Sequence, residues 1–232
     1  MKSIDQETYR QLVSSATVLE RDAHGEKVLA LADGNLVKIF RRKRWLSSAL
    51  LRPYAVRFVG NAAHLARRAI PTVTVLEIGS CRSLGRHLVT YRPLPGETLR
   101  HVLSREPAER ARLLRLLAAF VALLHQKGVY FRSVHFANII VLPDREQLGL
   151  IDVADLSLRR GPLSRGERLR NFRHLLRYAE DGGYLHEFGW MTFVASYLDA
   201  VSLPPVTREE LRVGLQKLAE LTPAVAQSRE ES

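Results

Sequence analysis

The sequence is poor in features that mark secreted, membrane-spanning or disulfide-stabilised proteins. It has one cysteine, Cys81, in 232 residues, which excludes an internal disulfide framework and suits a reducing cytosol. The longest apolar run, LLAAFVALL at 116–124, is too short to cross a bilayer. The stretch MKSIDQETYRQL at the start lacks the apolar segment of a secretory signal. We therefore expect a cytoplasmic protein in which Cys81 is a small, semi-buried residue.

Aromatic residues are scarce, and acidic residues are missing from one stretch. Aromatics make up 7% of the chain and show no interleaved pattern, which disfavours binding of single-stranded nucleic acid. The formal net charge of +11 points to a phosphorylated substrate, an anionic membrane surface or nucleic acid, with a solvated basic face as the alternative. No acidic residue lies between Asp33 and Glu77, where the basic residues are Lys38, Arg41, Arg42, Lys43, Arg44, Arg52, Arg57, Arg67 and Arg68.

Residues 1–92 read as a sheet with one helix. Three short apolar-rich runs lie within residues 16–40, separated by AHG at 23–25 and DGN at 33–35. Asp-Gly between such runs predicts a hairpin, because glycine adopts the positive φ that tight turns need. The later elements expected here are a helix within 52–70, carried by the helical spacing of Phe58, Ala62, Leu65 and Ala69, and strands at 71–79 and 86–94.

From residue 93 the pattern changes to helix. Pro107 in a first turn and Gly128 at the end predict a helix over 107–128, and its wide apolar face predicts a central, buried position. The remaining expected elements are strands at 138–142 and 148–152, a basic helix over 165–181, a final helix over 204–221 that opens with a capping box from Thr207 to Glu210, and a frayed tail after Thr222. The predicted fold is α+β and bilobal: a small N-terminal antiparallel β lobe with one helix at 1–92, and a mainly helical C-terminal lobe at 93–232, with a hinge near 92–98.

Lys38 lies in the middle of a predicted strand, NLVKIF. On an alternating strand it shares a face with Leu36 and Phe40, which should be turned towards an interior or a cleft. A buried ammonium group needs an anionic partner. Two interpretations stay open: a lysine that grips phosphate, and an edge-strand lysine whose stem reaches to water.

Asn138 and Asp152 stand at the two ends of a predicted hairpin. Asn138 precedes IIVL and Asp152 ends LGLI, so a tight hairpin brings both side chains to one end. An amide oxygen and a carboxylate suit Mg²⁺, which prefers oxygen ligands. Asp152 taken alone is equally compatible with a turn cap.

These residues together resemble the motifs of protein kinases. The catalytic loop H-R-D-x-x-x-x-N of that family is similar to FRSVHFAN at 131–138, with Ser133 in the aspartate position. The stretch DVA at 152–154 stands where D-F-G is expected, and Lys38 stands where V-A-I-K places its lysine. The resemblance implies a bilobal protein-kinase-like fold.

More narrowly, the chain resembles the lipopolysaccharide core kinases, the Kdo/WaaP family, and within it the toluene-tolerance branch, through KVLALADGNLVKIFRRKR, RFVGNAAHLARRAIPT, YFRSVHFANII and GLIDVADL. The resemblance implies ATP and Mg²⁺ as cofactors and phosphorylation of an inner-core sugar of lipopolysaccharide. It also implies a place at the cytoplasmic face of the inner membrane, with peripheral contact to anionic lipid. The implied site residues are Lys38, Asn61, Tyr91 and Arg92 for the nucleotide, Asn138 and Asp152 for the metal, and Ser133, Asp152 and His135 for catalysis.

Three departures from the kinase pattern concern catalysis. Ser133 replaces the aspartate that takes the acceptor hydroxyl's proton, the helix within 52–70 offers Asn61 instead of a glutamate, and the turn DAHGEK has one glycine, which weakens a backbone phosphate cradle. A base adds about 10²–10⁴-fold to a reaction that depends mostly on positioning and charge neutralisation. His135 or Asp155 could supply acid–base chemistry; the alternatives are an ordinary loop histidine and a cap.

Three functions stay open at this point. An ATP-dependent sugar kinase of the lipopolysaccharide core is favoured. A nucleotide-binding pseudokinase that regulates an envelope-building partner is the second. A basic nucleic-acid-binding module is the third, and neither a reading helix nor a stacking platform supports it.

Overall fold

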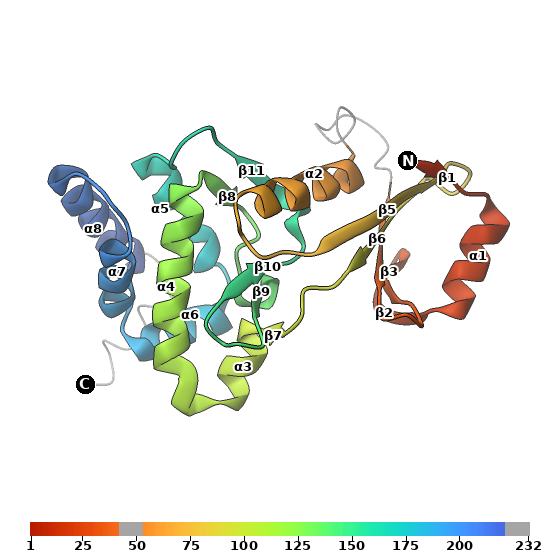
Figure 1. Ribbon diagram of the computed structural model, residues 1–232. Helices are drawn as coiled ribbons and strands as arrows, with labels where there is room; N and C mark the ends of the chain where they lie inside the picture. Colours follow the sequence, from red (N-terminus) through yellow and green to blue (C-terminus); the bar gives the residue numbers. More distant parts are fainter. Residues whose placement is uncertain (42–52, 221–232) are drawn as a thin grey trace. The chain divides into compact units, whose positions relative to one another are not determined.

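The computed structural model describes residues 1–41 and 53–220. The basic residues Arg42, Lys43, Arg44 and Arg52 and the tail after Thr222 lie outside these ranges. The chain divides into two compact units, residues 1–94 with 152–155 and residues 95–151 with 156–232 (Figure 1). None of the helices in the described ranges is long and apolar enough to span a membrane.

The first unit is built on a six-stranded sheet with the order β1-β5-β6-β4-β3-β2. All neighbouring strands are antiparallel except β1 and β5, which are parallel. The sheet is thus the expected antiparallel one, with a short parallel strand added at one edge. Its strands are β1 (Lys2–Ser3), β2 (Thr17–Asp22), β3 (Gly25–Ala30), β4 (Leu36–Arg41), β5 (Thr74–Cys81) and β6 (Arg86–Arg92).

Both predicted hairpin turns are confirmed. Gly34 has φ +81° between β3 and β4, and the Asp33 carboxylate accepts a hydrogen bond from the Asn35 backbone N–H at 3.0 Å. Gly25 has φ +115° at the start of β3. Glycine and an Asx turn therefore define these connections, as the sequence indicated.

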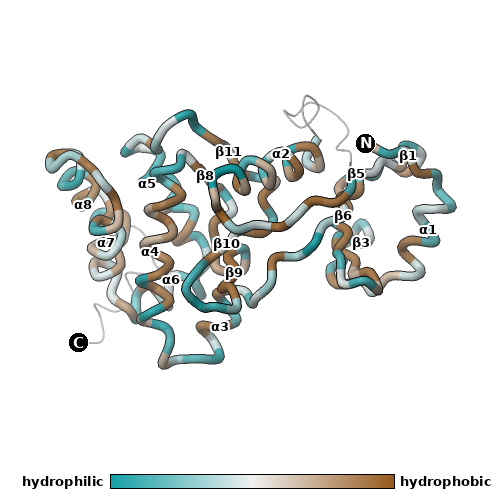
Figure 2. The backbone as a smooth tube through the Cα atoms, in the orientation of Figure 1, coloured by the Kyte–Doolittle hydropathy of each residue, from teal (hydrophilic) through white to brown (hydrophobic). Residues whose placement is uncertain are grey.

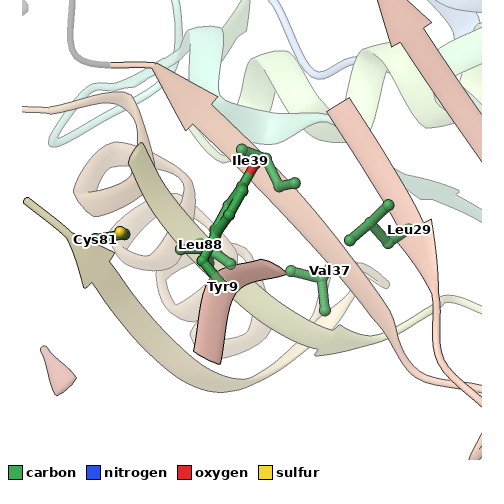
Figure 3. Packing of buried hydrophobic residues seen from close by; sticks show 6 residues of the cluster. All are labelled: Tyr9, Leu29, Val37, Ile39, Cys81 and Leu88. Atoms are coloured by element: carbon green, nitrogen blue, oxygen red, sulfur yellow. The ribbon is translucent and has the colours of Figure 1, made fainter. Parts of the chain in front are cut away.

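One face of the sheet is covered by α1 (Gln6–Ser15), a helix that the sequence analysis missed. Its Tyr9 packs into a buried cluster with residues of four strands (Figure 3). The first unit therefore has two helices among its described residues rather than one. Cys81 is fully buried in this cluster, deeper than the semi-buried position expected. The cluster consists of Tyr9, Leu29, Val37, Ile39, Cys81 and Leu88.

The expected helix within 52–70 is α2 (Tyr54–Arg67), and it packs against β5 and β6. Phe58 is its central contact, with ring centroids 5.8 Å from Phe40 and 5.6 Å from Tyr91. Ala69, expected at helical spacing, lies beyond the helix end and has φ +50°. The helix therefore ends two residues before the last position that its apolar spacing predicts.

The second unit is arranged around α4 (Arg110–Gln126), whose sides are buried along most of its length. Pro107 begins a short 3₁₀ turn before it, and Gly128 ends it with φ +70°. A Cβ on Gly128 would lie 2.4 Å from the Gly161 carbonyl oxygen, so glycine is required there for space as well as conformation. Hydrophobic segments recur along α4 (Figure 2), in agreement with the predicted central helix.

The strands of the second unit are short. β9 and β10 form the predicted antiparallel hairpin, with Ile139 opposite Leu150, and β8 pairs with β11, with Phe131 opposite Leu156. The Ile151 backbone N–H donates to the Asn138 carbonyl at 3.0 Å, so the hairpin closes next to Asp152 in the chain. The strands are β7 (Glu97–Thr98), β8 (Val129–Phe131), β9 (Ile139–Val141), β10 (Leu148–Leu150) and β11 (Leu156–Leu158).

The helical predictions after residue 160 need three corrections. The basic helix, α5 (Arg165–Leu175), ends before residue 181, because Tyr178 takes an extended backbone and α6 (Ala179–Phe188) begins after it. The next helix, α7 (Trp190–Asp199), was not predicted. The last, α8 (Pro205–Glu220), starts before Thr207, so the expected capping box from Thr207 to Glu210 lies inside the helix.

A capping box does exist at the start of α5. There the Ser164 hydroxyl accepts from the Glu167 backbone N–H, and the Glu167 carboxylate accepts from the Ser164 N–H. The remaining helix, α3 (Leu99–Arg105), begins with Thr98, whose hydroxyl accepts from the His101 N–H at 3.3 Å. Local side-chain caps therefore start both helices.

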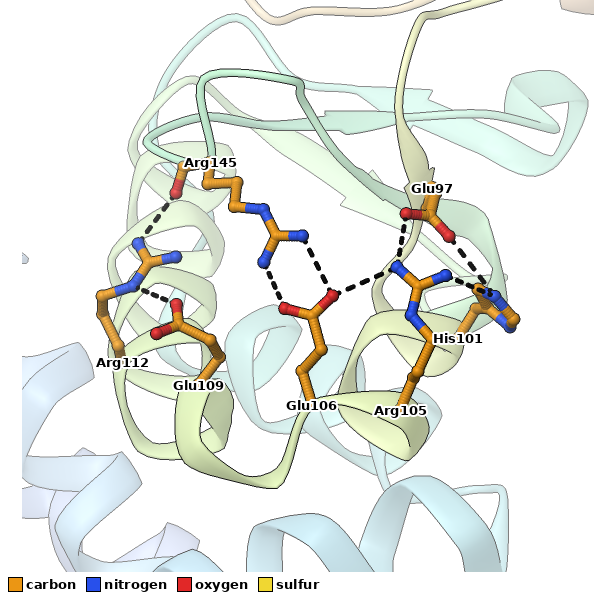
Figure 4. Close-up of polar contacts among 7 residues, drawn as sticks. All are labelled: Glu97, His101, Arg105, Glu106, Glu109, Arg112 and Arg145. Atoms are coloured by element: carbon orange, nitrogen blue, oxygen red, sulfur yellow. Dashed lines mark hydrogen bonds and ion pairs between the residues drawn. The ribbon is translucent and has the colours of Figure 1, made fainter.

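Surface ion pairs connect α3, the start of α4 and the β9–β10 turn (Figure 4). The Glu106 carboxylate accepts hydrogen bonds from Arg145 and Arg105. These guanidinium groups lower the pKa of the Glu106 carboxyl to about 2. Arg112 donates to the Arg145 carbonyl at 2.8 Å and pairs with Glu109 at 2.7 Å. The turn, where Arg145 has φ +58°, is thus fixed by charge-assisted hydrogen bonds.

Candidate functional site

Lys38 is positioned by the alternation of β4. Val37 and Ile39 point into the core beneath α1, so Lys38 lies on the other face with Leu36 and Phe40, all three half-buried. The Lys38 side chain is 13% exposed, and its Nζ lies 2.9 Å from Oδ1 of Asp152. The ammonium group therefore has an anionic partner in the same unit, and that partner comes from 114 positions further along the chain.

Asp152 has an unusual backbone for a residue with a side chain. Its φ is +52°, in the left-handed region that aspartate and asparagine visit more readily than other non-glycine residues. The Asp152 side chain is 44% exposed, so Lys38 leaves part of the carboxylate accessible. Backbone strain of this kind is found preferentially at functional sites, where surrounding contacts hold it in place.

The turn after Asp152 is held by α2. The Asn61 side-chain amide donates to the Val153 carbonyl at 2.7 Å, and Arg57 pairs with Asp155 at 3.6 Å. Asn61 is the residue that the sequence analysis placed among the nucleotide-binding residues. Its amide nitrogen donates to the backbone of the turn, and a role of Asn61 at the nucleotide stays a prediction.

Tyr91 and Arg92, the other expected nucleotide-binding residues, lie at the end of β6. The Tyr91 ring is buried against Phe58. Burial, with a smaller contribution from the charge of Asp152, raises the pKa of Tyr91 to about 12. Arg92 is exposed. Tyr91 therefore stays neutral and serves the core beneath α2, and Arg92 remains accessible.

The turn expected over the phosphates, residues 22–25, is held from outside by two arginines. Arg41 and Arg86 face each other on β4 and β6. Their guanidinium groups donate to the His24 carbonyl at 3.2 and 3.0 Å. These bonds fix the backbone of a turn that has one glycine.

In the second unit, Ser133, His135 and Asn138 form one loop after β8. The Asn138 side-chain nitrogen lies 3.0 Å from the Ser133 carbonyl oxygen and 3.0 Å from Nε2 of His135. A carbonyl oxygen only accepts, so the amide nitrogen must face it. Both N–H groups of Asn138 are then used inside the loop, and its side-chain oxygen is the atom that remains for a metal ion.

His135 accepts the second of these bonds, so its Nε2 lone pair is engaged and the ring proton belongs on Nδ1. The ring packs against Tyr178 with centroids 4.7 Å apart. The imidazole thus contacts Asn138 and Tyr178 within its own unit.

Asp181 anchors this loop, and the sequence analysis did not find it. Its fully buried carboxylate accepts from the Phe136 backbone N–H at 2.9 Å and from Arg100 at 2.9 Å. Burial raises the pKa of the Asp181 carboxyl, and the N–H of Phe136 and the Arg100 charge oppose that rise. In the sequence Asp181 is an acidic residue at the end of the basic stretch 165–181. Nothing in that stretch indicates that its partner is the backbone of Phe136, 45 residues away.

The predicted site residues therefore fall into two sets. Lys38, Asp152, Asn61, Tyr91 and Arg92 belong to the first unit, and Ser133, His135 and Asn138 belong to the second. Each set is organised by its own contacts. Their convergence around one nucleotide stays a prediction.

The donor atoms suit the metal that the sequence predicts. The partly exposed carboxylate of Asp152 and the side-chain oxygen of Asn138 are hard oxygen donors of the kind that Mg²⁺ prefers. Within residues 1–41 and 53–220, no cluster of three or more His, Cys, Asp or Glu side chains could hold a metal ion. Mg²⁺ in phosphoryl-transfer sites is held through a few protein groups together with substrate phosphates.

A unit built on a mostly antiparallel sheet and a mainly helical unit are both features of the protein-kinase-like fold, and comparison with solved structures supports this class. The chain is similar to a solved structure described as WaaP in complex with acyl carrier protein, with a TM-score of 0.58 and 20% sequence identity. The similarity covers 91% of this chain and 89% of that one. No protein-family model matches the sequence, and no curated protein matches it. The fold is thus protein-kinase-like and similar to that of the WaaP structure.

Proposed function

We propose that this protein is an ATP-dependent phosphotransferase that acts on a sugar of the lipopolysaccharide core. The observation that carries the proposal is the pair of Lys38 and Asp152, joined at 2.9 Å, with Asp152 in a left-handed backbone conformation. In kinases the corresponding lysine holds nucleotide phosphates and the corresponding aspartate holds Mg²⁺. The WaaP-like fold and the predicted motif order support the same assignment.

In this proposal each residue has one task. Lys38 binds the phosphates, and the oxygens of Asp152 and Asn138 hold the metal–nucleotide complex. When bound, Mg²⁺ neutralises charge on the phosphates. Ser133 accepts one hydrogen bond and donates another, which orients the acceptor hydroxyl. His135 is the candidate acid–base group, and its Nε2 lies 3.0 Å from the Asn138 side-chain nitrogen.

The direct test is single-turnover transfer of the terminal phosphoryl group from Mg-ATP to purified core lipopolysaccharide. We expect wild-type protein to transfer phosphate, and we expect Asp152→Ala to abolish transfer because it removes both the metal ligand and the partner of Lys38. Asp144→Ala is the matched control, since Asp144 accepts bonds from Glu146 and Gln147 in its own turn. Equal loss in both variants would count against the proposal.

The proposal also includes a location. The basic run at 41–44 would place the protein at the cytoplasmic face of the inner membrane, where each basic residue near an anionic leaflet contributes about 1 kcal/mol. Replacement of all four residues by alanine should weaken binding to anionic vesicles and leave binding to neutral vesicles unchanged. Equal binding to both vesicle types by the wild type would refute the membrane contact.

A second candidate, a nucleotide-binding pseudokinase, is favoured by two observations. Asn61 supports the Val153 carbonyl where a kinase glutamate would stand, and Ser133 occupies the aspartate position. A pseudokinase would bind Mg-ATP without transfer to any core lipopolysaccharide. Because the similar solved structure contains acyl carrier protein, the assay should be run with and without that protein before the wild type is called inactive.

A further inference from the structure

A chain of buried hydrogen bonds runs through the second unit and ends next to the Ser133 loop. It begins at Arg168 on α5, which is 2% exposed and donates to the Tyr197 hydroxyl oxygen at 2.6 Å. Tyr197 on α7 lies 2.9 Å from Nδ1 of His125 on α4. Nε2 of His125 lies 2.9 Å from Oδ1 of Asn171, and the Asn171 amide donates to the Phe131 carbonyl at 2.7 Å.

The direction of every bond in this chain follows from its two ends. Arg168 can only donate, so the Tyr197 oxygen accepts and its own hydrogen is directed to His125. The Phe131 carbonyl can only accept, so the nitrogen of Asn171 faces it and the oxygen of Asn171 faces His125. Nε2 of His125 therefore carries the hydrogen, and Nδ1 accepts from Tyr197. One neutral tautomer satisfies all the contacts.

This series of hydrogen bonds begins at a buried cation, Arg168, which packing alone does not require. No carboxylate is paired with Arg168 among the described residues, so a buried cation polarises the whole series towards the Phe131 carbonyl. Phe131 is the last residue of β8, and Ser133 follows two positions later. The backbone that leads to Ser133 is thus hydrogen-bonded to α5 through the Asn171 amide, in addition to the side-chain contact of Tyr130 on β8 with His174 on α5 at 3.1 Å.

We propose that Asn171 is a positioning residue for Ser133: oriented by His125, its amide holds the Phe131 carbonyl and sets the position of the Ser133 hydroxyl relative to the acceptor. This inference rests on the proposed phosphotransfer. Asn171 lies outside the kinase-like motifs. It would act on the loop through its hydrogen bond to the Phe131 carbonyl and not through a contact with the nucleotide. A loop shift of about 1 Å is enough to slow a positioned reaction by up to about 100-fold.

The test compares variants at two positions of the hydrogen-bond series, Asn171 and Tyr197. Asn171→Asp keeps an oxygen for His125 and removes the N–H that Phe131 requires. Tyr197→Phe removes the hydroxyl at the far end and leaves Asn171 in place. We expect Asn171→Asp to lower the single-turnover rate about 10- to 100-fold and to change KM for ATP less than the rate, because Lys38 and Asp152, the proposed nucleotide and metal ligands of the first unit, keep their own contact. Tyr197→Phe should lower global stability, because buried Arg168 loses an acceptor, but it should change the rate far less than Asn171→Asp does.

Hydrogen–deuterium exchange of peptides within residues 129–137 gives a readout that needs no catalysis. Asn171→Asp should speed exchange there, and Tyr197→Phe should not. If wild-type protein transfers no phosphate, the proposed function fails, and the exchange result still decides whether Asn171 positions the loop. If Asn171→Asp does not fold, Asn171→Ser, whose hydroxyl is too short to reach the carbonyl, replaces it.

Two results would overturn the inference. One is a change of rate and exchange that is equal in both variants and follows their loss of global stability, since that describes a structural network only. The other is an Asn171→Asp variant with wild-type rate and wild-type exchange in 129–137.

Discussion

Mild acid should destabilise the fold through a single buried histidine. His125 is fully buried, and burial, opposed only in part by the Asn171 hydrogen bond, lowers its pKa from 6.5 to about 3. The unfolded chain therefore binds a proton between about pH 6.5 and pH 3 that the folded chain does not. Stability is fully present above the unfolded pKa and is lost as pH falls through this window.

The magnitude follows from the width of that window. One group that is protonated only in the unfolded state changes the free energy of unfolding by about 1.4 kcal/mol per pH unit. Between pH 6 and pH 4, where the two states differ by nearly one proton, the expected loss is about 2.5 kcal/mol. That is a large part of the 5–15 kcal/mol or so that stabilises a typical domain.

Urea unfolding at half-unit steps from pH 4 to pH 7 measures this loss. Trp190 fluorescence reports the region directly, since its ring lies 6.0 Å from Phe172 beside His125, and Trp45→Phe removes the other indole. His125→Gln keeps an amide for Asn171 and cannot be protonated, so its curve should lack the His125 slope. Ion pairs such as that of Glu106 titrate equally in both proteins and cancel in the difference. Parallel curves for the two proteins would refute the reasoning.

Three further outcomes are expected. Mg-ATP at about 100 times its Kd should stabilise the fold by about 2.7 kcal/mol, and Asp152→Asn or Lys38→Met should remove most of the shift in a thermal melt; an unchanged wild-type melt would contradict nucleotide binding. Ser133→Ala should slow single-turnover transfer about 10-fold, less than the roughly 10²–10⁴-fold that a proton-transfer group contributes, because orientation is all that its hydroxyl supplies; a loss as large as that of Asp152→Ala would contradict this role. Gly96→Ala should destabilise by more than about 2 kcal/mol in urea, because its φ is +120° and a Cβ would lie 2.1 Å from the Val141 carbonyl oxygen; a wild-type urea midpoint would contradict it.

The features of the fold that could be predicted are those set by residues close together in the sequence. Asp33-Gly34 specified a turn through positive φ, and Pro107 and Gly128 bounded a helix whose apolar face is buried as expected. The capping signature misled at Thr207 and was overlooked at Ser164. A capping box requires non-helical backbone at its first residue, and Pro205 already begins the helix two positions before Thr207.

The candidate site was predictable only where a motif supplied the spacing. Lys38 and Asp152 were found because their neighbours resemble kinase motifs, and they are paired at 2.9 Å. Asp181 and Asn171 were not found, because each acts on a backbone atom 40 or more residues away and leaves no periodic trace near itself. A polar residue whose partner is a distant carbonyl looks, in sequence, like any residue of a surface helix.

The contact between Lys38 and Asp152 also bears on whether the missing glutamate in α2 implies a protein without catalytic activity. In kinases the helix glutamate keeps the strand lysine in place while the aspartate holds the metal. Here Asp152 itself pairs with Lys38, its left-handed backbone brings the carboxylate into reach, and Asn61 of α2 holds the following carbonyl. The helix therefore still contributes to the lysine's position, through the turn rather than through a charge. A pseudokinase needs more than the absence of that glutamate, because in this chain the lysine has not lost its partner.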